Sequence, residues 1–165
     1  MEDLLSRFRT YADPREGLDG NPFRLRCSVG LPATPDEISS AWPDRGLPPE
    51  LTQFWSNARE CRLFEDVDYG QWGLAILSPE SSARRTADEQ ARRPGDFHRE
   101  DIVVGEFLGD QDLLILAPSD ISLCQVLVEL PLDHRLDWPK VADGLAEFLE
   151  LYLESYGAKF WERID

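Results

Sequence analysis

The sequence is poor in cysteine and histidine, the residues that most often cross-link small folds or bind transition metals. Its 165 residues include three cysteines and two histidines. The cysteines, Cys27, Cys61 and Cys124, are odd in number and widely spaced, and no two form a CxxC pair. Such spacing favours neither a disulfide framework nor a zinc site. We therefore expect no metal, no cofactor and a reducing compartment.

Long apolar runs are also missing. No run approaches the roughly 20 apolar residues that a membrane-spanning helix needs. The start, Met1-Glu2-Asp3, is acidic and resembles neither a signal peptide nor a transit peptide. The protein is therefore expected to be cytoplasmic. Apolar residues make up 42% of the chain and charged residues 30%, which is typical of a folded globular protein. The length indicates a single domain, 1–165.

Catalytic signatures are absent from the sequence. It contains no GxSxG elbow, no Walker A motif and no GxGxxG pattern. His98 and His134 stand in polar turns, so each is expected on the surface. The segment 66–70 has a calcium-loop spacing of acids, but Leu77 occupies the place where such a loop needs a glutamate. We expect a protein that binds rather than an enzyme.

Basic residues are scarce, and this limits the partners. The chain has 32 acidic and 17 basic residues, for a net charge of −15. Nucleic acids and anionic membranes would be repelled, whereas a basic protein partner would be attracted. No lysine or arginine occurs from Ile102 to Leu130. The alternative interpretation is that the acidic surface only maintains solubility.

Apolar spacing and turn residues predict an α+β fold with one antiparallel sheet and helices packed on it. Thr34 and Glu37 form a capping-box pattern that begins a helix, and a further helix begins near Pro49. Another helix is expected over 2–12. Strands are expected at 23–29, 61–65, 72–77, 102–108, 113–116 and 126–130.

Two segments near these strands carry specific expectations. The stretch 80–93 is polar and lacks an apolar stripe, so it is predicted to be an exposed loop with a frayed helix. A terminal helix is predicted from Trp138 to Tyr156. Its apolar face would pack Val141, Leu145, Phe148 and Tyr152 onto the sheet.

The order of four segments resembles the SUKH superfamily of bacterial immunity proteins. The stretch Gly46–Trp55 is similar to the LPxxLxxFY-type segment that opens that fold. Phe107–Leu116 resembles its central hairpin, Gln125–Leu130 its next strand, and Val141–Leu149 its terminal helix. The resemblance covers about 34–156 and leaves 1–33 as an N-terminal extension. The hairpin differs from the family in having Asp-Gln-Asp where a glycine-rich turn is frequent.

The resemblance implies an immunity protein that binds and neutralises a cognate polymorphic or contact-dependent toxin, for instance a nuclease. Relatives of this kind also include intracellular regulators, so a regulatory or scaffold protein is the alternative. The superfamily has no shared catalytic centre.

The acidic turns and the aromatic residues beside them are the predicted partner-binding surface. If the turns are neighbours, their acids would form one negative face with aromatic anchors of the kind that binding hot spots favour. In the alternative interpretation, Trp72 belongs to the core and the acids are scattered. The predicted contact residues are Glu65, Asp66, Asp68, Tyr69, Trp72, Asp110 and Asp112.

Overall fold

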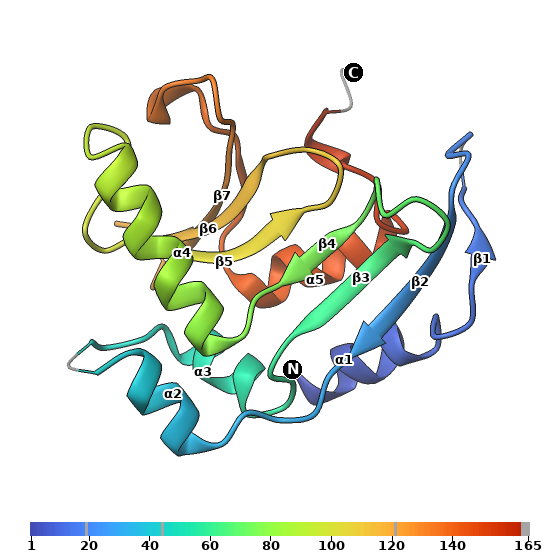
Figure 1. Cartoon of the computed structure of the whole chain (residues 1–165), viewed down its shortest axis with the longest axis horizontal. Coiled ribbons are helices and arrows are strands. Elements are labelled where there is room, and N and C mark those ends of the chain that lie inside the picture. Colours follow the sequence, from blue (N-terminus) through green and yellow to red (C-terminus); the bar gives the residue numbers. More distant parts are fainter. Residues whose placement is uncertain (19, 44, 121, 163–165) are drawn as a thin grey trace.

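The fold is a single antiparallel sheet with helices on both faces, which confirms the predicted α+β class (Figure 1). A computed structural model describes residues 1–18, 20–43, 45–120 and 122–162. The eight strands pair in chain order, each antiparallel to the next. They are β1 (Arg15–Glu16), β2 (Arg24–Val29), β3 (Cys61–Asp66), β4 (Leu74–Ile76), β5 (Ile102–Phe107), β6 (Leu113–Ala117), β7 (Gln125–Glu129) and β8 (Lys140–Ala142).

Five α-helices connect or flank the strands. The capping box that was predicted at Thr34 is confirmed, because its side chain accepts from the Glu37 amide and the Glu37 carboxylate accepts from the Thr34 amide. Helices α1 and α5 lie on one face of the sheet and α4 on the other (Figure 1). The helices are α1 (Glu2–Arg9), α2 (Pro35–Ala41), α3 (Pro49–Trp55), α4 (Pro79–Arg92) and α5 (Leu145–Glu154).

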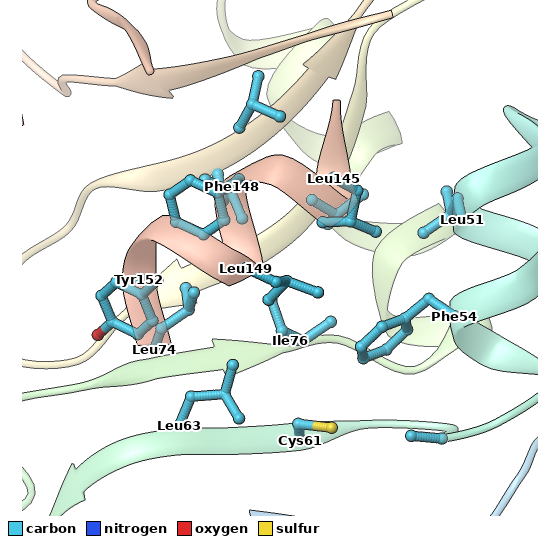
Figure 2. Packing of buried hydrophobic residues seen from close by; sticks show 14 of the residues in the cluster. Leu51, Phe54, Cys61, Leu63, Leu74, Ile76, Leu145, Phe148, Leu149 and Tyr152 are labelled. Atoms are coloured by element: carbon cyan, nitrogen blue, oxygen red, sulfur yellow. The ribbon is translucent and has the colours of Figure 1, made fainter. Parts of the chain in front are cut away.

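The main core lies between the sheet and α1, α3 and α5. In Figure 2, Leu145, Phe148 and Tyr152 of α5 project toward the strands and α3. Phe148 and Tyr152 are buried and their rings stack with centroids 5.7 Å apart. The predicted apolar face is therefore confirmed for Leu145, Phe148 and Tyr152, whereas Val141 is buried but lies in strand β8 and not in the helix. A smaller core on the other face gathers Phe97, Val103, Leu113, Ile115, Ala117, Leu127 and Trp138.

The prediction of an exposed loop with a frayed helix over 80–93 is wrong. Helix α4 is regular, is capped by the Ser78 side chain and packs on β5. Its buried residues are Pro79, Ser82, Thr86 and Glu89, and two of them bond directly to the strand. The Ser82 hydroxyl donates to the Val103 carbonyl at 2.6 Å, and the Thr86 hydroxyl accepts from the Val103 amide at 2.9 Å. The helix therefore has no apolar stripe for sequence analysis to detect.

The terminal helix is shorter than predicted. Its expected first turns instead contain strand β8, which pairs with β7 and follows the 3₁₀ turn η1 (Arg135–Asp137). Helix α5 begins after Gly144, and the carboxylate of Glu50 in α3 accepts from the amides of Leu145 and Ala146 at 2.7 and 3.3 Å. A side chain distant in sequence thus satisfies amides that begin the helix.

Residues 1–33 belong to the same sheet and core as the rest of the chain. Helix α1 buries Leu5 and Phe8 completely, and β2 pairs along β3. The Sγ atom of Cys27 in β2 accepts a hydrogen bond from the Phe64 amide of β3 at 3.2 Å. The segment predicted as an extension therefore completes the sheet. Within the described ranges, no helix is both long and apolar enough to cross a membrane.

Candidate functional site

The antiparallel order places alternate turns at the same end of the strands. This end carries the β1–β2, β3–β4, β5–β6 and β7–β8 connections, and the segment 155–162 after α5 returns to it. We call this the loop edge. The predicted contact residues Glu65, Asp66, Asp68, Tyr69, Trp72, Asp110 and Asp112 all lie along it or on the strand ends beside it.

The two acidic turns of the loop edge are in direct contact. The Leu108 amide at the end of β5 donates to the Gly73 carbonyl at 2.8 Å. Gly109 has φ +87°, and a Cβ atom there would lie 2.0 Å from the Gln71 carbonyl oxygen. Only glycine fits this contact. The sequence therefore brings the β3–β4 and β5–β6 turns together as one surface.

Asp66 requires a correction, because its carboxylate is buried beneath that surface. The residue is 2% exposed, and its carboxylate accepts from the amides of Asp68 and Gln71 at 3.1 and 3.2 Å. Aspartate commonly stabilises a turn by bonding to amides a few residues ahead. Asp66 therefore shapes the β3–β4 turn and does not face a partner.

The two other acids on this side of the loop edge are paired with arginines. Glu65 lies 3.0 Å from the Arg62 guanidinium and 3.7 Å from that of Arg26. Asp68 lies 3.3 Å from Arg24 on β2. These pairs leave less uncompensated negative charge than the local sequence indicates.

Asp110 and Asp112 share one basic partner, Lys159 from the C-terminal segment. The Lys159 ammonium lies 2.8 Å from the Asp110 carboxylate and 2.6 Å from that of Asp112. Burial of the ammonium opposes its charge, but the hydrogen bonds and charges of the two aspartates outweigh burial and raise the pKa of Lys159. The pair fastens the C-terminal segment to the β5–β6 turn.

Aromatic side chains give the loop edge its apolar character. Tyr69 is 77% exposed at the tip of the β3–β4 turn. Trp72 is half-buried, its indole donates to the Gly157 carbonyl at 3.0 Å, and its ring lies 6.0 Å from that of Phe23. Trp72 therefore has both a structural and a surface role. It lines a cavity of about 580 Å³ with Leu18, Phe23, Tyr156 and Lys159.

The β7–β8 side of the loop edge rests on buried ions. Glu129 at the end of β7 pairs with Arg93, which follows α4. Burial of its carboxylate raises the pKa of Glu129 to about 7, although the Arg93 charge opposes the shift. Asp101 is fully buried and accepts from the Arg135 guanidinium at 2.9 Å.

Among the described residues of this edge, groups capable of nucleophilic or metal chemistry are not assembled. Both histidines are exposed. All three cysteines are buried, and burial raises the pKa of Cys27 and of Cys61 to about 12, which disfavours the reactive thiolate. Among the described residues, no three His, Cys, Asp or Glu side chains are grouped as metal ligands.

Sequence analysis missed the C-terminal and N-terminal contributions to the site. Lys159 and Phe23 complete it from segments far from the acidic turns, and no local motif marks either one. The chain was also compared with known proteins. No model of a known protein family matches it, and no curated protein matches it in sequence.

Proposed function

We propose that this protein is an immunity protein of the SUKH type, which neutralises a bacterial toxin domain by binding it through the loop edge. The observation that carries the proposal is the edge itself. Turns from separate parts of the chain are fastened together there. They present the exposed ring of Tyr69 and a cavity whose lining includes Phe23, Trp72 and Tyr156. Exposed aromatic residues on a rigid support are typical of binding hot spots.

The arrangement of the four family-like segments supports this proposal. Gly46–Trp55 contains α3, Phe107–Leu116 contains the β5–β6 turn and most of β6, and Gln125–Leu130 contains β7. Val141–Leu149 contains the end of β8 and the start of α5. The first and last segments are joined physically, because Glu50 accepts from the amides that begin α5.

A binding mechanism also suits the electrostatics of the edge. Its carboxylates bond to backbone amides, as at Asp66, or pair with basic side chains, as Asp112 does with Lys159. These contacts hold the turns in their conformation. Neutralising a toxin requires only that the bound protein covers the toxin's substrate site. The net charge of −15 favours a basic partner, such as a nuclease domain.

One observation favours the alternative, an intracellular regulatory or scaffold protein of the same type. The acids that were predicted to face a basic toxin are paired within the molecule, as Asp68 is with Arg24 and Asp112 with Lys159. A surface whose negative charge is partly compensated in this way also suits a partner that is not strongly basic.

A protection assay distinguishes the two. The proposal predicts a toxin gene beside this one, and cells would express the toxin domain that it encodes, with or without this protein. We expect the wild type to restore growth and Tyr69→Ala to protect less, with binding to the toxin weakened at least about tenfold. The matched control is Leu123→Ala, an 83% exposed residue at the other edge of the sheet. Failure of the wild type to protect would favour the regulatory alternative.

A further inference from the structure

The β7–β8 loop (130–139) exposes two leucines almost completely. Leu132 is 98% exposed and Leu136 is 97% exposed, more than any other large apolar side chain among the described residues. The loop projects beside the C-terminal end of α4 (Figure 1). Because both side chains remain in water, they contribute no hydrophobic stabilisation to the isolated protein.

Arg93 binds the backbone of the loop through hydrogen bonds. Its guanidinium donates to the carbonyl oxygens of Leu130 and Pro131 at 3.4 and 3.2 Å, and also to that of Asp133. The same group pairs with Asp96 at 3.0 Å. One side chain thus fixes the backbone on both sides of Leu132.

Arg135 holds the second half of the loop. Its guanidinium bonds to both carboxylate oxygens of the fully buried Asp101, and its amide donates to the Asp96 carboxylate at 3.1 Å. The Trp138 ring supports both arginines, with each guanidinium carbon 5.5 Å from the ring centroid. The Trp138 indole donates to the Asp133 carbonyl at 3.2 Å.

Such a network fixes a conformation more effectively than it adds stability. Burying charged groups costs free energy that their pairing only partly offsets. Here the buried ions, Arg93, Asp101, Glu129 and Arg135, order a loop whose apolar side chains point into solvent. Order in the free protein reduces the entropy lost on binding, which is the property expected of a preorganised contact.

The charges around the two leucines indicate the occupant. Both exposed acids in the loop, Asp133 and Asp137, stand next to them, whereas the side chain of Arg135 is mostly buried against Asp101. A second copy would bring the same acids and a net charge of −15, and an anionic membrane would also be repelled. A protein surface with an apolar groove and a basic rim is complementary.

We propose that Leu132 and Leu136 are the principal apolar anchors of this protein, and that they enter an apolar groove with a basic rim on the partner. The inference rests on the proposed function, which makes that partner the toxin domain. It extends the interface from the Tyr69 side of the loop edge to the β7–β8 side.

The test measures binding of the full-length chain to the toxin domain encoded beside its gene, by surface plasmon resonance. Leu132→Ala/Leu136→Ala is compared with Leu31→Ala/Leu123→Ala, which changes two leucines that are 85% and 83% exposed at the other edge. We expect the loop variant to weaken binding about 100-fold, mainly through faster dissociation, and the control to match the wild type. All four leucines are exposed, so melting temperatures should stay unchanged.

Other results would overturn the inference. If the loop variant binds like the wild type while Tyr69→Ala weakens binding, the anchors are wrong and the proposed function stands. If the wild type does not bind the toxin domain, both proposals fail. Dimerisation in sedimentation velocity that the loop variant abolishes would identify a second copy as the occupant. Leucine-dependent sedimentation with vesicles of phosphatidylcholine and phosphatidylglycerol would identify a membrane.

Discussion

At the scale of single residues, the buried carboxylate of Glu129 has an unusual environment. It is 1% exposed, one of its oxygens has no hydrogen-bond partner among the described residues, and Glu89 adds a further negative charge nearby. Burial is the largest cause of its raised pKa of about 7, against an ordinary value of 4.5. Between these two values the folded protein retains a proton that the unfolded chain has lost.

The shift determines the sign of a pH effect on stability. Because the folded state binds more protons, the Glu129 contribution to the free energy of unfolding is fully present below pH 4.5 and decreases as pH rises toward 7. Glu129→Gln mimics the protonated form. We expect its stability relative to the wild type to rise between pH 5 and pH 8, by up to roughly 3 kcal/mol.

Urea denaturation of both proteins at each pH measures the difference. Arg93 keeps Asp96 and three carbonyl partners in the variant, so the loop should remain anchored. Asp96 itself has a lowered pKa, mainly from the hydrogen bond of the Arg135 amide, so its effect falls at more acidic pH and is common to both proteins. Parallel pH profiles for the two proteins would contradict the assignment.

At the scale of elements, the sequence predicted the helices and strands that are marked by residues close together in the chain. The capping box at Thr34, the proline start of α3 and the apolar strands β5, β6 and β7 each depend on neighbouring residues. Strands β1 and β8 contain two and three residues, too few to establish an alternation. Helix α4 was mispredicted because its buried face carries Ser82 and Thr86, which bond to a strand instead of forming an apolar stripe.

The polar packing of α4 leads to a test. Thr86→Val keeps the side-chain shape but removes the acceptor of the buried Val103 amide, so the variant should lose about 1–3 kcal/mol of unfolding free energy. Thr52→Val, on the exposed side of α3, is the matched control and should change stability by less than about 0.5 kcal/mol. Equal effects of the two changes in urea titrations would show that α4 does not depend on this bond.

At the scale of the whole molecule, the sequence left open whether the acidic turns are neighbours, and it did not predict that their acids are paired. Alternate turns of an antiparallel sheet lie at the same end of its strands, so the contact between 67–73 and 108–112 follows from strand order. The pairing of Asp112 with Lys159 spans 47 positions, and no local pattern encodes it. Leu132 and Leu136 gave no signal either, because exposure of a leucine in a turn depends on the surrounding fold.

The most direct test of the account is complex formation between the purified protein and the toxin domain encoded beside its gene, followed by stopped-flow mixing at several salt concentrations. We predict a one-to-one complex with a Kd below about 1 μM. Its association rate should fall as salt increases, because opposite net charges steer the encounter. Absence of a complex at micromolar concentrations and low salt would contradict the central claim that this protein acts by binding a toxin.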